Sequence, residues 1–172
     1  LTCGDPVVDV VVLHSIESVT AAHKYGVQVQ NESKDNSAKI PLDIPKEDQS
    51  LTGQLDDLMR NAVEAVVETG RDCDLGDESI IEDLCSVSGD NFVIGKMSYK
   101  VVVVPQSVTW RPKTFELLKQ FNANGGKIII LGKLPYELDC TDAQNEWLEL
   151  ARSANVWTIP NNKFHLQAVL DK

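Results

Sequence analysis

Val101-Val102-Val103-Val104-Pro105 decides the fold of this chain together with a second apolar stretch, Lys127-Ile128-Ile129-Ile130-Leu131-Gly132. Neither stretch alternates apolar and polar residues as a strand with one solvated face does. Strands that are apolar throughout are buried on both faces, which is typical of a parallel sheet covered by helices. Phe115, Leu118 and Phe121 lie between the two stretches at helical spacing. The sequence therefore predicts two parallel strands joined by a helix.

The rest of the chain repeats this alternation of strand and helix. Strands are predicted at 7–13, about 71–75 and 156–159, and helices at about 55–69, 77–84 and 143–151. Turn residues at 88–91 lie between two short apolar segments, which predicts a β-hairpin. The order favours an α/β fold: a flavodoxin-like, doubly wound, mainly parallel five-stranded sheet with helices on both faces and a β-hairpin excursion at one edge.

The length and the first residues suggest one domain of a larger protein. A chain of 172 residues is long enough for a single domain with a hydrophobic core. Residues 1–6 contain neither an initiating Met nor a signal segment, so we expect residues 1–172 to be a piece of a longer multidomain chain. Residues 25–52 are polar and predict a long loop that is mobile or functional.

The net charge of the chain limits the classes of partner that we expect it to bind. A net charge of −10 disfavours nucleic acid, which requires clustered Lys and Arg, and also disfavours anionic membrane surfaces. No apolar stretch approaches the roughly 20 residues of a membrane-spanning helix. We therefore expect a soluble domain that binds neither nucleic acid nor membrane, and no targeting segment identifies its compartment.

The sequence carries no motif for a metal or a cofactor. Cys3, Cys73, Cys85 and Cys140 are scattered, without the Cys-x-x-Cys pairs of zinc or redox centres. Their spacing leaves open either a Cys73–Cys85 disulfide or free thiols packed as small apolar groups. No G-x-G-x-x-G or Walker pattern occurs. We therefore expect no metal and no cofactor.

Polar and aromatic side chains follow the predicted strands. The carboxyl ends of parallel strands meet at one edge, which is where ligands bind in doubly wound folds. The candidates for contacts at this rim are His14, Glu17, Asp77, Glu78, Trp110 and Arg111. None of them is assigned a catalytic role, because each also has a structural interpretation.

The carboxylates of the rim have two interpretations. Glu17 with Asp77 or Glu78 could supply the acid and the base of a hydrolase. Alternatively, Asp77 caps a helix and the helix dipole stabilises Glu78 in the first turn. Glu17 is then solvated or paired with Arg111. The sequence favours the structural interpretation.

The other three rim residues also have alternatives. His14 could be a base or a metal ligand, but no second histidine lies at ligand spacing, which favours a hydrogen-bonded structural imidazole. Trp110 could stack on a sugar or a partner while Arg111 clamps hydroxyls or carboxylates. Alternatively, Trp110 covers the end of the sheet and Arg111 begins a helix. The sequence leaves these two interpretations open.

Several of these segments together resemble a known family. They are 12–18, 74–78, 99–105, 114–118 and 125–129. The chain resembles the class I glutamine amidotransferase-like domains of large bacterial glycoside hydrolases, of which the β-galactosidase trimerisation domain is the best-known example. The resemblance covers nearly the whole chain except the polar loop. Its most specific part is Asp-Leu-Gly-Asp-Glu at 74–78, followed by a hairpin.

The chain departs from the catalytic members of that family at the nucleophile. Amidotransferases of this fold carry a Cys in a G-x-C-x-G elbow, and the matching residues here are 132–136, with Leu134 at the Cys position. The family's late His-x-Glu pair is also missing, because Leu166 and Gln167 follow His165. Glutaminase activity requires an activated nucleophile with its base, so the resemblance implies none.

The resemblance implies an accessory role in carbohydrate metabolism. Such a domain braces the catalytic domain of a glycoside hydrolase, mediates oligomer contacts or borders the carbohydrate cleft. The implied partners are the other domains of the parent hydrolase, a carbohydrate and a second copy of the chain. The alternative is an autonomous small-molecule hydrolase or carbohydrate-binding module that uses the strand-end rim.

Overall fold

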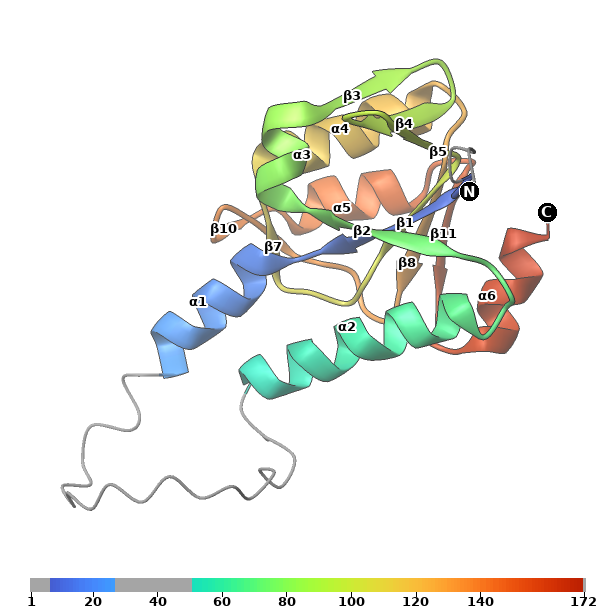
Figure 1. The fold of residues 1–172 in the computed structure, drawn as a ribbon. Coiled ribbons are helices and arrows are strands. Elements are labelled where there is room, and N and C mark those ends of the chain that lie inside the picture. Colours follow the sequence, from blue (N-terminus) through green and yellow to red (C-terminus); the bar gives the residue numbers. More distant parts are fainter. Residues whose placement is uncertain (1–6, 27–50, 172) are drawn as a thin grey trace, which may run out of the picture.

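The computed structural model describes residues 7–26 and 51–171. Five strands form one all-parallel sheet in the order β2-β1-β6-β8-β11 (Figure 1). Their bounds are β1 (Val10–His14), β2 (Cys73–Asp77), β6 (Val101–Val104), β8 (Lys127–Leu131) and β11 (Val156–Ile159). This is the flavodoxin-like order, with its switch point between β1 and β6. The predicted α/β fold is confirmed, and the two apolar stretches lie side by side as β6 and β8.

Helices cover both faces of this sheet. The described helices are α1 (Ile16–Gly26), α2 (Leu51–Val67), α3 (Glu78–Leu84), α4 (Pro112–Ala123), α5 (Gln144–Ala151) and α6 (Lys163–Leu170). α2 and α6 pack on one face, and α3, α4 and α5 pack on the other (Figure 1). α1 leaves the carboxyl end of β1 and packs against α2. The sequence patterns predict neither α1 nor α6.

Each buried strand contributes to two separate cores. Val11 and Leu13 of β1 belong to the core under α3, α4 and α5, whereas Val10 and Val12 belong to the core under α2 and α6. Successive side chains of a strand point to opposite faces of a sheet. A strand covered on both faces therefore has no polar position, which explains the unbroken apolar stretches.

The predicted hairpin is confirmed and is longer than expected. β3 (Cys85–Ser88) and β4 (Asn91–Ile94) pair antiparallel around the turn at 89–90, and β5 (Met97–Tyr99) adds a third strand. This small sheet packs on α4 instead of extending an edge of the main sheet. Phe92 is fully buried there, with its ring 5.5 Å from that of Phe121. Burial of this ring holds the hairpin against the helix.

A second small sheet, which the sequence does not predict, joins the loops that follow β6 and β8. β7 (Thr109–Trp110) pairs parallel with β9 (Glu137–Leu138), and β9 pairs antiparallel with β10 (Thr141–Asp142). Asp139 and Cys140 form the β9–β10 turn with φ of 49° and 58°, the left-handed values that a tight hairpin turn requires. Strands of two residues are too short to produce a periodic sequence pattern.

Both ends of the predicted loop at 25–52 are helical, and residues 27–50 are not among the described residues. Tyr25 and Gly26 belong to α1, and Leu51 and Thr52 belong to α2. The middle of the loop lies outside the described residues.

Candidate functional site

The all-parallel sheet brings the ends of β1, β2, β6 and β8 to one edge, as expected. His14 and Asp77 occupy the last paired position of β1 and β2. Nδ1 of His14 lies 3.9 Å from Oδ2 of Asp77, and both side chains are half-buried. The other rim residues lie around the first turns of α1, α3 and α4.

Asp77 is the N-cap of α3, as its structural interpretation predicts. Its Oδ1 accepts a hydrogen bond of 2.8 Å from the backbone N–H of Ser79. Burial raises the pKa of Asp77, but the hydrogen bonds from Ser79 and Ile80 and the nearby His14 together lower it below its ordinary value. Asp77 therefore stays ionised in its capping role.

Arg111 connects the helices α1, α3 and α4 at the rim. Its Nη2 lies 2.7 Å from Oε1 of Glu17 in α1, and its Nη1 lies 2.5 Å from Oε2 of Glu82 in α3. The residue itself is the N-cap of α4, followed by Pro112 at the first helical position. The hydrogen bonds to Glu17 and Glu82 raise the pKa of Arg111 against the effect of burial. The predicted Glu17–Arg111 pair and the predicted start of the helix at Arg111 are both confirmed.

Glu78 is fully buried beside this ion pair. Its Oε2 accepts a hydrogen bond of 2.7 Å from the backbone N–H of Arg111, and its Oε1 has no hydrogen-bond partner among the described residues. Burial raises the pKa of Glu78 to about 7. The backbone N–H groups of Arg111 and Glu17 oppose this rise, the Glu17 carboxylate adds to it, and the Arg111 guanidinium also opposes it. At neutral pH a large fraction of this carboxyl carries its proton.

Glu78 has the raised pKa of a general acid, but its side chain is buried away from any ligand. Carboxyl groups whose surroundings separate their pKa values are the usual acid and base of a hydrolase. A general acid must also lie within hydrogen-bond reach of the substrate. Glu78 is 0% exposed, so its proton reaches no ligand at the surface. Glu78 therefore fills the junction of α1, α3 and α4 and offers no acid to a ligand.

Trp110 does not form the contact surface that one interpretation predicts. Its side chain is fully buried, and its indole Nε1–H donates a 2.6 Å hydrogen bond to Oγ of Ser107. The expectation that Trp110 stacks on a sugar or a partner is wrong, because β7 carries the indole into the core below α4. Its other interpretation, as a cover for the end of the sheet, is the correct one.

Ser18 is a rim residue that the sequence does not identify. From the first turn of α1 its Oγ donates to the carbonyl of Thr109 (2.7 Å) and accepts from the backbone N–H groups of Val108 (3.1 Å) and Thr109 (2.9 Å). These bonds fasten the loop after β6 to α1, across the switch point where a ligand would enter. Its partners lie about ninety positions away, so no local motif reveals them.

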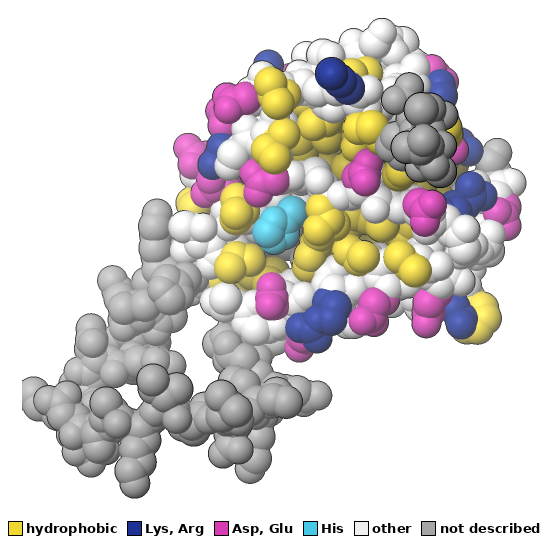
Figure 2. Space-filling view, in the orientation of Figure 1, with side chains coloured by type: hydrophobic (Ala, Val, Ile, Leu, Met, Phe, Trp, Pro, Cys, Tyr) yellow, Lys and Arg dark blue, Asp and Glu magenta, His cyan; other side chains and the backbone are white. Residues whose placement is uncertain are grey.

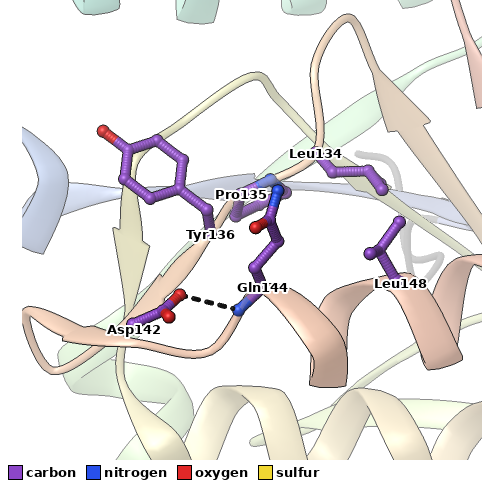
Figure 3. A pocket seen from close by; sticks show the side chains of 6 residues that line it. All are labelled: Leu134, Pro135, Tyr136, Asp142, Gln144 and Leu148. Atoms are coloured by element: carbon purple, nitrogen blue, oxygen red, sulfur yellow. Dashed lines mark hydrogen bonds between the residues drawn. The ribbon is translucent and has the colours of Figure 1, made fainter.

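A pocket lies beyond the carboxyl end of β8, next to the switch point where Ser18 joins α1 to the loop after β6. It is lined by Leu134, Pro135, Tyr136, Asp142, Gln144 and Leu148 and has a volume of about 240 Å³. The Gln144 side chain rises from the start of α5 toward Pro135, with the two leucines on one side and Tyr136 and Asp142 on the other (Figure 3). The sequence patterns identify neither the tyrosine nor the two polar residues as a site.

The residues that match the amidotransferase elbow have a different geometry here. A nucleophile elbow is a sharp turn from a strand directly into a helix. After β8, Gly132 adopts a φ of 78°, and Gln106 Oε1 accepts the backbone N–H of Lys133 (3.1 Å). The β9–β10 hairpin then precedes α5, which begins only at Gln144. Leu134 is partly buried against the core.

The cysteines described by the structure are free thiols. Cys73 and Cys85 are half-buried and Cys140 is exposed, so the alternative of a Cys73–Cys85 disulfide is wrong. Burial raises the pKa of Cys73 and raises that of Cys85 to about 12, which keeps both thiols protonated. Cys3 lies outside the described residues.

The described part of the chain holds neither a candidate metal site nor a candidate membrane-spanning helix. Within residues 7–26 and 51–171, no three His, Cys, Asp or Glu side chains are grouped as a metal site requires. None of the described helices combines the length and apolar character needed to cross a membrane.

Comparisons with known proteins give no match for this chain. No model of a protein family matches it, and neither a curated protein nor a solved structure matches it. Its function is therefore inferred from the geometry and the residues of the two regions at the sheet edge.

Proposed function

We propose that this chain is a noncatalytic accessory domain that docks on the catalytic domain of a glycoside hydrolase. The observation that supports this function is the closed switch point. Ser18, Glu78 and Trp110 fill it with buried hydrogen bonds, and Arg111 is held by two carboxylates. The resemblance to amidotransferase-like domains, with a leucine at the nucleophile position, favours the same role. The sheet then serves as a scaffold.

The docking surface that we propose is the β2 face, which we define as the exposed edge of β2 with Leu75 on the α2 side of the sheet and with Ile80 and Leu84 of α3 on the other side. β2 is an outermost strand of the sheet, and these three side chains of β2 and α3 are 50–61% exposed. Hydrophobic side chains gather over this part of the molecule, with acidic side chains among them (Figure 2). Edge strands are normally covered or defended by charge, and a partner that covers this one would bury its apolar groups.

The charges around the β2 face indicate the chemistry of the partner. Asp72 and Asp83 lie beside it, are exposed, and form no ion pair among the described residues. The whole chain has a net charge of −10. Complementary potentials guide association, so the partner domain should offer an apolar surface bordered by Lys or Arg.

Association with the remainder of the gene product tests this function. This chain and the rest of the polypeptide that its gene encodes are expressed separately and mixed in a calorimeter. Leu75→Asp should weaken their association about tenfold or more, because burial of one leucine is worth roughly 1.5–3 kcal/mol. Phe164→Asp is the matched control, since Phe164 on α6 is also exposed but lines a pocket with Glu68 and Thr69 at the end of α2, outside the β2 face.

Two outcomes would contradict the proposal. A gene that encodes this chain alone, or two parts that do not associate, excludes docking on a catalytic domain of the same protein. Turnover of aryl glycosides or glutamine by the isolated chain that Glu17→Gln abolishes would show an autonomous enzyme. Circular dichroism of that variant confirms that the loss is not unfolding.

A further inference from the structure

The pocket beyond β8 has the composition of a sugar site. Its floor is apolar, formed by Leu134, Pro135 and Leu148, and its polar groups come from Asp142 and Gln144. Binding sites for small molecules are mostly apolar with a few placed polar groups. It also lies beyond the carboxyl end of a parallel strand, the edge where doubly wound folds bind ligands. We propose that this pocket binds one neutral sugar ring.

Tyr136 supplies an exposed aromatic ring on a backbone that is held in place. Its ring is 46% exposed, and Phe164 is the other exposed large aromatic side chain in the described part of the chain. Its backbone N–H donates to Val108 O (3.2 Å), and its carbonyl accepts from Ala143 N–H (2.9 Å). The backbone of Tyr136 is therefore fixed from both sides before a ligand arrives. A preorganised aromatic group loses little entropy on binding.

Asp142 and Gln144 provide complementary hydrogen-bonding groups. Oδ1 of Asp142 accepts the backbone N–H of Gln144 at 3.2 Å, which orients the carboxylate, while Oδ2 has no partner within the described residues. The carboxamide of Gln144 offers both a donor and an acceptor. A sugar hydroxyl also donates and accepts, so one ring can engage both side chains at once.

The size and charge of the pocket disfavour larger ligands and anionic ligands. A volume of about 240 Å³ lies below the roughly 300–1,000 Å³ of sites for drug-sized molecules, which limits the occupant to one ring. The Asp142 carboxylate repels phosphates and carboxylates. The lining contains no cation among its six residues. A neutral polyhydroxylated ring satisfies the stacking surface and both polar groups without introducing a charge.

Titration of the intact chain with single sugars tests the site. ¹H–¹⁵N spectra are recorded with D-glucose, D-galactose and L-rhamnose, and the amides of 134–144 should shift with millimolar affinity for at least one of them. Tyr136→Ala should weaken that binding about tenfold through loss of the stacking surface. Phe164→Ala, which removes the other exposed ring, should leave it unchanged.

Charged sugars and a variant of the β2 face sharpen this test. D-glucuronate should bind more weakly than D-glucose, because its carboxylate faces Asp142. No shift at 134–144 with any of the three neutral sugars, or binding that Tyr136→Ala leaves intact, overturns the proposal, as does binding of glucosamine alone. Leu75→Asp should not affect sugar binding, so the outcome here is independent of docking at the β2 face.

Discussion

The switch point between β1 and β6 and the pocket beyond β8 lie on the same edge of one sheet, yet they are built in opposite ways. At the switch point, Ser18, Glu78 and Trp110 are fully buried and make hydrogen bonds to backbone or side chains around them. Beyond β8, Tyr136 and Asp142 are exposed, and the polar side chains there hold few partners. Topology alone favours the switch point as the ligand site.

This difference shows that the position where a fold usually binds ligands need not be the position that is open to a ligand in a particular protein. Buried, hydrogen-bonded groups contribute to stability, whereas exposed polar groups around an apolar floor remain available to a ligand. Substitutions at the switch point should therefore change the free energy of unfolding. Substitutions in the pocket should change binding and leave that free energy nearly unchanged.

Trp110→Ala should have the largest effect on the closed region. Truncation of a fully buried aromatic side chain typically destabilises a protein by about 3–5 kcal/mol, because it removes buried area and leaves a cavity. The substitution also removes the Nε1–H donor to Ser107. Urea unfolding followed by circular dichroism measures the change. A loss below about 1 kcal/mol, as expected for an exposed ring, would show that the switch point is less tightly packed than the structure indicates.

Glu78→Gln should remove a pH dependence of stability. The pKa of Glu78 is about 7 in the folded chain and ordinarily 4.5, so the folded state keeps a proton that the unfolded state releases. Stability from this group is fully present below pH 4.5 and is lost as the pH rises through 7. At a pH of about 8 the neutral variant should be more stable than the wild type by an amount on the order of 3 kcal/mol.

The matched measurement uses an exposed glutamate of the chain. Glu149→Gln is the matched control for the loss of a carboxylate, since Glu149 is exposed and forms no ion pair among the described residues. Unfolding curves at several pH values between 4.5 and 7 give the comparison. Equal curves for wild type and Glu78→Gln would mean that Glu78 is ionised in the folded chain. Arg111 would then stabilise the carboxylate against the effects of burial and of the neighbouring Glu17.

Ser18→Ala tests the fastening of the loop after β6. The variant leaves the buried N–H of Thr109 and the partly buried N–H of Val108 without their acceptor, and each unsatisfied buried group is worth about 1–3 kcal/mol. We expect a loss in the same range, measured by urea unfolding. Ser86→Ala on β3, where the serine is exposed, should change stability by less than about 0.5 kcal/mol. Equal effects of the two substitutions would remove Ser18 from the closing of the switch point.

The fold was accessible from the sequence because its signals are local. Unbroken apolar runs identify β6 and β8, and Asp77 is followed by a helix whose first amides it caps, as predicted. α6 is short and its apolar residues follow a polar loop, so its pattern is weak. The turn between β9 and β10 is formed by Asp139 and Cys140 in left-handed conformations, and residues other than glycine seldom adopt these. The sequence therefore contains no turn motif that predicts the two strands.

The candidate sites were less accessible because they depend on contacts between distant segments. A Trp-Arg pair after a strand has the same local sequence whether the indole is exposed or buried, and only the packing of β7 decides for Trp110. The sequence offered the Glu17–Arg111 pair as one of two alternatives for Glu17, and the structure shows that the pair forms. The pocket residues come together only when β9 and β10 bring Asp142 next to Tyr136, which no spacing encodes.

Among the substitutions in the two regions, Tyr136→Ala should have the smallest effect on the free energy of unfolding. A small effect would distinguish the exposed pocket from the buried switch point most clearly. The ring is exposed, so its removal opens no cavity and should change the free energy of unfolding by about 0.5 kcal/mol or less. Its backbone hydrogen bonds to Val108 and Ala143 remain, because alanine keeps the same N–H and carbonyl. If urea unfolding instead shows a loss near that of Trp110→Ala, the tyrosine is part of the core and the pocket is a packing defect. A Tyr136→Ala variant that stays folded but loses sugar binding would show that the exposed pocket serves binding, whereas the buried switch point serves stability.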